Sequence, residues 1–592
     1  MKHSKIATKS KILITSRLEE SLAKLSKSDL LHLGSWSLKE NDYKSLRLNN
    51  KINLIKNRWS DPDTKKKDYI YIKFLFYKYL KILSNFLNRY HGIKKNNYYW
   101  TLLCGIWLSY YIPFQYYRWM KVSEVLKGNN KIKYLQFKFK NFPIVLDTIA
   151  FYRAATTSNI FNYFYFQRII LSQKKKFKII KKKKLISFEE DKIFILNNKS
   201  SIIKKIILYL VNVFYFFFIK KKIYLIYDGF KLSVIFILNI SLRQFPVFFN
   251  SIFNWYNIRH KFFSKMNIKK RMFFKKKITF NNKFESFLYE CLFYDIPYCF
   301  LEKYNSIINE TKKISLEPKI VLSGTPHFYN EKFKFWIAEK DIKNNFFVVC
   351  HGGYHQKYSN IFEYEDLISE NNHEWTKKKN QINLPAGKYI FYRKKRKIYK
   401  YLLFVGYEIH LYPCGIVSGP TSDPYLINVK ELLFLNKNLK NEIVENFIYC
   451  PKFGYIKEQI NLINGIMGPR LLKEGSFNKY LYQSKLIICS YPNTAYFDSL
   501  LTGPTILFCD LNQWPPIENL NKVYKNLIDN KLLFQDVNEL TKHINENWNK
   551  IEDWWDSQAV KSALYNFLNK FNFNISKPTG KWLEFIKNNS QN

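Results

Sequence analysis

The sequence LIICSYPNTAYFD occupies residues 486–498, and the chain continues with GPTILF at 503–508. A second stretch, FFVVCHGGYH at 346–355, has the same organisation, because a short apolar run gives way to small polar residues. Continuous apolar runs of this length are typical of parallel strands that are covered on both faces. The polar residues then lie at the carboxyl ends of the strands, where ligands bind in open α/β sheets. These stretches predict an α/β protein with a ligand site at the strand ends.

The chain on either side contains two series of further strands. Strand-like runs occupy 11–15, 30–36, 223–227 and 318–323 in the first series, and 399–405 and 447–450 in the second. Between the series, Pro385, Gly387 and the basic run RKKRK at 393–397 indicate a linker. We therefore predict two Rossmann-like, doubly wound domains, 1–397 and 398–592.

Helical patterns accompany both predicted domains. Apolar residues recur at helical spacing over 69–90, and 98–122 is a second long helix with Pro113 inside it. These two helices form a predicted insertion at about 65–125 in the first domain. The region 536–573 predicts the helices that close the second domain.

The charge balance is strongly basic. Lys plus Arg is 96 and Asp plus Glu is 46, which gives a formal net charge of +50. Such a charge favours nucleic acid or an anionic membrane as a partner. The lysines are spread over the whole chain, however, and Asn, Ile, Phe and Tyr are also frequent, as A/T-rich codons would produce. No nucleic-acid-binding motif is found among the basic residues, so we expect no nucleic acid, with a membrane-surface contribution as an addition.

Cysteine usage and hydropathy indicate a location in the cytoplasm. The 8 cysteines include no Cys-x-x-Cys pair, which favours a reducing compartment without structural zinc. No apolar signal segment follows the basic first residues. The uncharged run 98–117 contains Gly, Pro and many Tyr, and the apolar run 206–219 is short for a membrane span, so we interpret both as buried elements. The basic run 174–184 is interpreted as a solvated face or loop, with an anionic-lipid patch as the alternative.

Several short motifs occur in order along nearly the whole chain. They are LHLGSW at 31–36, NRYHG at 88–92, HGGY at 351–354, SGP at 418–420, PKFGY at 451–455 and EDWW at 552–555, and they are densest within 484–514. Together they make the chain resemble the transferases encoded in lipopolysaccharide O-antigen and other surface-polysaccharide gene clusters. That family looks distantly similar to two-domain nucleotide-sugar glycosyltransferases of the GT-B architecture and to polyol-phosphate transferases.

The resemblance implies a substrate class. We expect a nucleotide-sugar or CDP-polyol donor and a glycan or lipid-linked glycan acceptor, with no cofactor beyond the donor. A lipid-linked acceptor would bring the enzyme to the inner face of the plasma membrane as a peripheral protein. Asp61-Pro62-Asp63 is interpreted as a turn, and no acidic cluster favours a bound metal, so we expect metal-independent transfer.

The HGGY stretch predicts the acceptor side of the site. His351 at a strand end is a candidate catalytic base, because an imidazole with a pKa near neutral can take the proton of an attacking hydroxyl. Gly352 and Gly353 allow backbone N–H groups to approach an anionic ligand, and Tyr354 completes this acceptor-side phosphate loop. The alternative, that His351 only hydrogen-bonds the glycine turn, stays open. His327, at another strand end, is expected to cap a helix.

The second stretch predicts the donor side. Ser490, Asn493 and Thr494 supply short polar groups beside the N–H groups of a helix that starts near Thr494, a combination that suits a diphosphate. Asp498 lies one turn into that helix and is the candidate for holding the donor ribose, as a carboxylate in this region does in two-domain transferases. The alternative is an ordinary acidic residue that interacts with the helix dipole.

Two other functions remain open at this point. One is a non-catalytic, membrane-surface scaffold of the same pathway, in which Tyr354 and His355, which stand where the family pattern usually continues with glycine, mark lost activity. The other is a nucleic-acid-binding protein, which only the net charge suggests and which would bind with a steep salt dependence.

Overall fold

The computed structural model describes most of the chain. The described residues are 11–22, 29–38, 53–127, 132–173, 176–188, 210, 222–244, 252–253, 255, 266–280, 282–340, 342–352, 357–358, 360–369, 373, 375–377, 382–390, 396, 400–406, 410–416, 422–451, 457–473, 475–573 and 575–590. Gly353, Tyr354 and nearly all of the apolar run 206–219 lie outside these residues, so the predictions made for them stay predictions.

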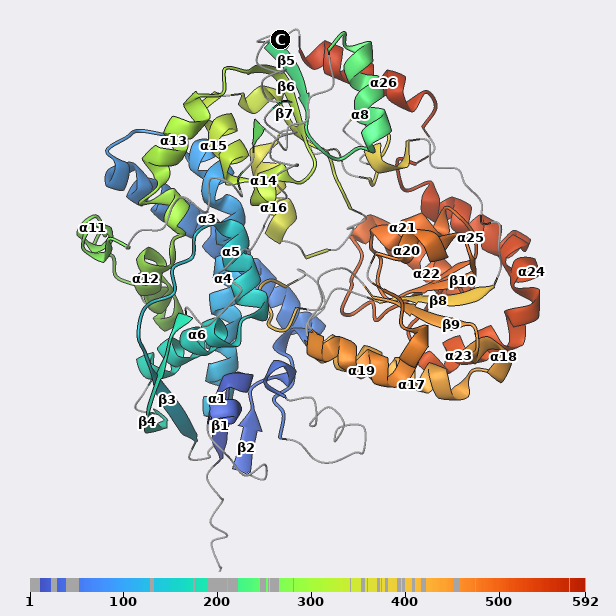
Figure 1. Cartoon of the computed structure of the whole chain (residues 1–592), viewed down its shortest axis with the longest axis horizontal. Helices are drawn as coiled ribbons and strands as arrows, with labels where there is room; N and C mark the ends of the chain where they lie inside the picture. Colours follow the sequence, from blue (N-terminus) through green and yellow to red (C-terminus); the bar gives the residue numbers. More distant parts are fainter. Residues whose placement is uncertain are drawn as a thin grey trace, which may run out of the picture.

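The strands of the described residues form three parallel sheets (Figure 1). The first contains β1 (Ile12–Ile14), β2 (Leu30–His32), β3 (Lys133–Phe139) and β4 (Lys178–Ile186), in the order β2-β1-β3-β4. The second contains β5 (Lys222–Ile226), β6 (Glu317–Ser323) and β7 (Phe346–Val348), in the order β5-β6-β7. The third contains β8 (Tyr401–Val405), β9 (Phe447–Cys450), β10 (Ser484–Cys489), β11 (Thr505–Phe508) and β12 (Leu533–Phe534), in the order β12-β11-β10-β8-β9.

The α/β class with parallel sheets is therefore confirmed. Apolar runs form the strands as predicted: β10 lies between β8 and β11, and its residues Leu486 to Cys489 are all buried. The described chain before residue 398 contains two sheets, where the sequence predicts one Rossmann-like sheet. The division at residue 397 and the Rossmann-like character of the two parts stay predictions.

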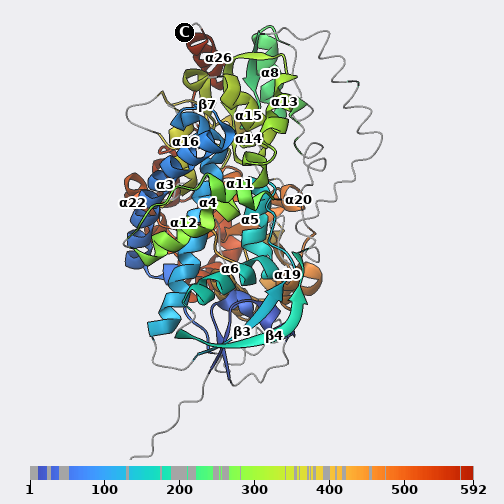
Figure 2. The same cartoon turned by 90° about the vertical axis from the view of Figure 1, so that its left-hand side faces the viewer.

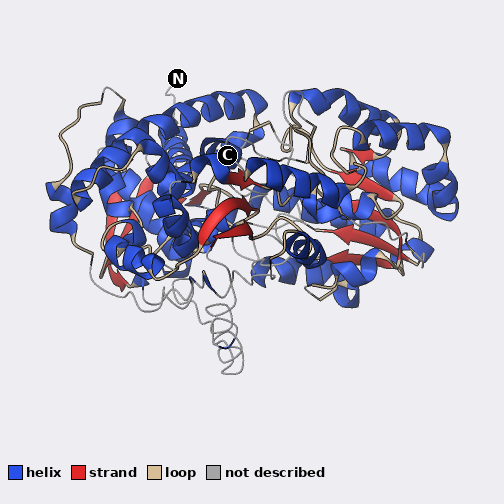
Figure 3. Cartoon of the chain, turned by 90° about the horizontal axis from the view of Figure 1, so that it is seen from above, coloured by secondary structure: helices blue, strands red, loops and turns tan. Residues whose placement is uncertain are grey.

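Helices surround the sheets (Figure 3). Those that belong to the first two sheets include α1 (Arg17–Leu22), α3 (Pro62–His91), α4 (Asn97–Lys127), α5 (Thr148–Thr157), α6 (Asn159–Ser172), α8 (Leu232–Ser241), α11 (Ile268–Phe273), α12 (Lys283–Asp295), α13 (Tyr304–Lys312), α14 (Pro326–Tyr329), α15 (Glu331–Lys340) and α16 (Asn360–Ile368). Those that follow β8 include α17 (Ser422–Asn438), α18 (Asn441–Val444), α19 (Lys457–Met467), α20 (Phe477–Leu481), α21 (Thr494–Leu500), α22 (Asn521–Asp529), α23 (Val537–Asn547), α24 (Ile551–Asp556), α25 (Gln558–Leu568) and α26 (Pro578–Asn589).

Helix α4 is the centre of the first half of the molecule. Nearly every residue from Tyr99 to Arg118 is buried, on all sides of the helix. A helix that is apolar all round must be covered all round, and α3, α5, α6, α12, α15 and α16 pack against it (Figure 1). Pro113 is accommodated inside it. The predicted burial of 98–117 is thus confirmed, and none of the helices that the structure describes is long and apolar enough to cross a membrane.

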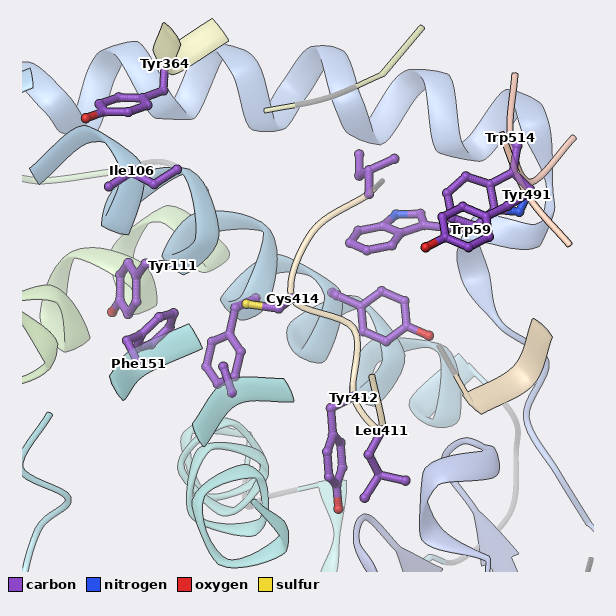
Figure 4. Packing of buried hydrophobic residues seen from close by; sticks show 14 of the residues in the cluster. Trp59, Ile106, Tyr111, Phe151, Tyr364, Leu411, Tyr412, Cys414, Tyr491 and Trp514 are labelled. Atoms are coloured by element: carbon purple, nitrogen blue, oxygen red, sulfur yellow. The ribbon is translucent and has the colours of Figure 1, made fainter. Parts of the chain in front are cut away.

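The two halves of the chain interlock. The segment 410–416, which follows β8, enters the core around α4, where Leu411, Tyr412 and Cys414 are buried (Figure 4). Tyr412 N donates a hydrogen bond to Thr156 O at 3.0 Å. The guanidinium of Arg118 in α4 donates to Pro413 O at 2.9 Å. A loop from the second half therefore completes the core of the first.

The C-terminal helix of the second half also packs against the first half of the chain. Helix α26 packs beside α8 at the top of Figure 1. Trp582, Phe585 and Ile586 join the apolar cluster that underlies β5–β7. The sequence predicts that the closing helices end at 573 and belong to the second domain, whereas this last helix packs on the second sheet.

Residues 178–184 of the basic run 174–184 belong to a strand rather than to a loop. Strand β4 lies at the edge of the first sheet, at the bottom of Figure 2, and its lysine side chains are largely exposed. Lysines on an edge strand discourage pairing with another chain. The solvated face is confirmed and the loop is wrong, because the backbone pairs with β3 despite the charge.

Substitution of Trp582 tests the packing of α26 on the second sheet. Its side chain is buried, and its indole N–H donates to Pro385 O at 2.9 Å. We expect Trp582→Ala to lower stability by about 3–5 kcal/mol, because it leaves a cavity in the core. Amide hydrogen exchange should accelerate in β5–β7, and thermal unfolding should start earlier. Lys581→Ala, an exposed neighbour on the same helix, is the control; faster exchange confined to the third sheet would contradict the arrangement.

Candidate functional site

The carboxyl ends of the second and third sheets meet. His351 and Gly352 follow β7, and Thr494 begins α21 shortly after β10. A Cβ atom added to Gly352 would lie 3.5 Å from the Thr494 hydroxyl oxygen. Two stretches that lie about 140 residues apart in the sequence are thus in direct contact, and the structure brings His351, Gly352 and Thr494 together.

Glycines let the backbone approach closely at the ends of β5 and β6. Gly229 has a φ of +95°, and a Cβ on Gly324 would lie 2.5 Å from Gly229 N. A Cβ on Gly387 would lie 2.5 Å from Gly229 O, so a side chain fits at neither position. The Asp228 carboxylate holds this turn, since it accepts from Gly229 N at 2.8 Å and from the Thr325 hydroxyl at 2.5 Å.

His351 follows β7 at this edge of the second sheet. Its side chain is exposed to solvent, yet burial among surrounding protein atoms lowers its pKa below the usual value. Nearby His327 lowers the pKa further, while Glu365, Asp228 and a hydrogen bond with the Gly324 backbone oppose the shift. The exposure allows access to the ring, and the lowered pKa keeps the imidazole neutral at neutral pH.

Behind His351 lies a buried polar trio. His327 Nδ1 shares a hydrogen bond with the Ser323 hydroxyl at 2.9 Å, and its Nε2 lies 3.1 Å from a carboxylate oxygen of Glu365. Burial lowers the pKa of His327 to about 3. The predicted capping role of His327 is wrong, because the N-cap of α14 is Thr325. Sequence reasoning missed the trio: Ser323 is four residues away, but no pattern indicates Glu365.

Two predicted donor-side residues have local partners. The Ser490 hydroxyl donates to Val405 O at 2.8 Å, which ties β10 to β8. The Asn493 side chain accepts from Tyr496 N at 3.0 Å and caps α21. The helix begins at Thr494 as predicted. The N–H groups of the first turn of a helix have no carbonyl partner earlier in the same helix. The Thr494 hydroxyl is the donor-side group nearest to Gly352.

Asp498 lies where the two halves meet. One carboxylate oxygen is 2.8 Å from Lys388 Nζ. The other oxygen, Oδ1, is buried without a hydrogen-bond partner among the described residues. Burial lowers the pKa of Lys231. The charge of Asp498 raises this pKa and the charge of Lys388 lowers it, so the three charged groups lie close together. A buried acceptor without a donor costs about 1–3 kcal/mol, and a ligand hydroxyl would satisfy it.

Other polar residues around β10 have structural partners. Arg396 of the predicted linker is buried, and its guanidinium donates to Pro504 O at 2.6 Å and to Ser499 O at 2.9 Å. The 503–505 turn therefore holds Arg396. Lys485 lies near the amino end of β10, away from the strand ends that form the site.

The next features are the possible metal ligands and the cysteines of the described residues. No group of three His, Cys, Asp or Glu side chains that could hold a metal occurs within the described ranges. All eight cysteines lie among the described residues, are buried and form no disulfide. Metal-independent transfer stays a prediction, as do the roles of the eight predicted site residues.

The buried His327 predicts a pH dependence of stability. Between pH 6.5 and about 3, the unfolded chain binds a proton at this residue that the native chain does not. Stability therefore falls as the pH is lowered through this window, by up to about 1.4 kcal/mol per pH unit for one histidine. In His327→Gln we expect the thermal unfolding midpoint to fall less steeply between pH 6 and 4. Ser323→Ala, which keeps the buried ring, should retain the wild-type slope; equal slopes in all three proteins would contradict this assignment.

Comparison with known proteins identifies the family. Residues 11–586 match the family model described as LIC12162 family transferase. No curated protein matches the chain. Because the family match spans nearly the whole chain, including both halves of the site, the protein belongs to the LIC12162 family of transferases.

Proposed function

We propose that the protein transfers a glycosyl or polyol-phosphate group from a nucleotide-activated donor to a cell-surface glycan acceptor. One observation carries the proposal: the carboxyl ends of two parallel sheets meet at Gly352 and Thr494, with a neutral imidazole on one side and a helix start on the other. The family name supports group transfer. The O-antigen or surface-polysaccharide pathway and a cytoplasmic location rest on the resemblance alone.

His351 is the proposed general base. Its lowered pKa keeps the ring neutral, so it can accept the proton of an acceptor hydroxyl. The acceptor oxygen forms a bond to the anomeric carbon or to phosphorus. The bond from that atom to the nucleotide breaks, and the nucleotide leaves with the electron pair. The histidine later releases the proton to solvent.

The donor is proposed to bind against the start of α21. The N–H groups at a helix N-terminus and the Thr494 hydroxyl suit phosphate oxygens. The buried, unsatisfied Oδ1 of Asp498 is a hydrogen-bond acceptor for a donor hydroxyl. Lys388, held in place by Asp498 at 2.8 Å, offsets phosphate charge. No metal is needed when cationic side chains do this.

Donor binding and turnover separate the proposed roles. Titration with nucleotide sugars and CDP-polyols should show binding to the wild type. Asp498→Asn should weaken it about tenfold or more, because it removes the charged acceptor that holds Lys388. His351→Ala should keep binding and lose about 10²–10⁴-fold in turnover, the usual contribution of a general base.

Asp529→Asn, the same change at an exposed position on α22, is the control and should behave as the wild type. If no nucleotide binds to the wild type, or if the Asp498 and Asp529 variants bind alike, the donor assignment is wrong. Bound nucleotide without any turnover would favour the scaffold alternative.

The pH profile tests how His351 is tuned. Activity requires the neutral ring, so kcat/KM should stay level below pH 6.5 and fall only when the pH approaches the lowered pKa. Glu365 opposes the lowering, so Glu365→Gln should move the acid limb to still lower pH. Glu363→Gln on the same helix, which removes the partner of Lys73, is the control. An acid limb that does not move in Glu365→Gln would show that another group titrates.

A further inference from the structure

Helix α8 has an uncovered apolar face. The helix has the sequence LSVIFILNIS and contains no charged residue. Val234, Leu238 and the adjoining Leu242 pack onto the core beneath β5–β7. On the other side, Leu232 is 79% exposed, Phe236 53%, Ile237 39% and Ile240 55%. A helix that is apolar all round is normally covered all round, so this face lacks a partner within the described chain.

Cationic residues lie at the ends of this helix and on the helix packed beside it. Lys231 and Arg243 flank the helix at its two ends, and Arg243 is exposed. Neighbouring α26 adds the exposed Lys581 and Lys587, against one exposed acid, Glu584. An apolar strip with a basic rim is the pattern of a helix that lies in a membrane interface, where the apolar side chains enter the acyl region and the cations contact anionic headgroups.

Charge also decides between a bilayer and a second copy of the chain. Each copy carries a formal net charge of +50, so two copies brought together through a basic-rimmed face repel each other. An anionic bilayer attracts the same charge. The occupant that fits both the apolar strip and its rim is therefore an anionic lipid surface.

We propose that the exposed face of α8 docks on an anionic lipid bilayer. The position of the helix gives this contact a use, because α8 starts four residues after Asp228, at the carboxyl end of β5. A docked molecule holds His351 next to the membrane, where the head of a lipid-linked acceptor is presented. This last step rests on the proposed function; the docking itself does not.

Vesicle co-sedimentation tests the docking. The wild type should bind vesicles of phosphatidylcholine with phosphatidylglycerol, bind pure phosphatidylcholine weakly, and lose affinity as salt increases. The double variant Phe236→Ser/Ile240→Ser should bind the anionic vesicles at least tenfold more weakly. Arg243→Gln should weaken binding several-fold and reduce the salt dependence. Phe273→Ser, on α11 at the far left of Figure 1 and 80% exposed, is the matched control and should bind as the wild type.

Two results would overturn the proposal. One is equal vesicle binding by the double variant and the wild type. The other is a wild-type dimer that becomes a monomer in the double variant by light scattering, which would assign the face to a second copy. Circular dichroism and thermal unfolding check that the variants fold. Transfer to a soluble acceptor should be unchanged in the double variant, while transfer to a lipid-linked acceptor in vesicles falls at least tenfold; if no transfer occurs at all, the vesicle result still decides the docking.

Discussion

The structure depends on the burial of one helix whose surface is apolar on every side. Covering α4 requires helices from before and after it in the chain, and two of these, α15 and α16, flank the segment that contains β7 and His351. In α15, Lys334 donates to Leu103 O at 3.1 Å. In α16, the Tyr364 hydroxyl donates to Leu102 O at 3.1 Å. The segment with β7 and His351 lies between these two helices, so one turn of α4 fixes it at both ends.

The same constraint joins the two halves of the molecule. Because the core around α4 is completed by the segment 410–416, the third sheet cannot move far without opening that core. Helix α26 adds a second attachment, beneath β5–β7. A cleft between two freely hinged domains would vary in width, whereas here the approach of Gly352 to Thr494 is set by packing on both sides. Enzymes that position two substrates gain from such pre-organisation, because little ordering remains for the reaction step.

The sequence predicts the local features of this arrangement and misses the partners. Apolar runs mark β7 and β10, and the Tyr-rich run marks α4, since burial on all sides requires that composition. A strand sequence does not specify its neighbour, so the division of the first series into two sheets had no signal. Arg396 lies in a run of five cations that predicts a solvated linker, yet it is buried. A charge is buried only where partners satisfy it, and the carbonyl groups of Ser499 and Pro504 lie about a hundred residues away.

In the site, too, the sequence predicts local features but not the residues that contact them from elsewhere in the chain. Asp498 was expected at the start of a helix, but its partner Lys388 precedes it by 110 residues. That lysine belongs to the loop 382–390, in which Gly387 packs against Gly229 and the Tyr389 hydroxyl donates to Thr494 O at 3.3 Å. One short loop therefore touches the acceptor-side turn and the donor-side helix. Any ligand that draws Asp498 Oδ1 into a hydrogen bond must also act on Lys388, and through the adjoining Gly387 on the Asp228–Gly229 turn.

A carboxylate with one paired and one buried, unsatisfied oxygen is a poor structural link, because an apolar contact would join the halves without leaving an acceptor unpaired. This geometry supports the proposed role of Asp498 in donor binding.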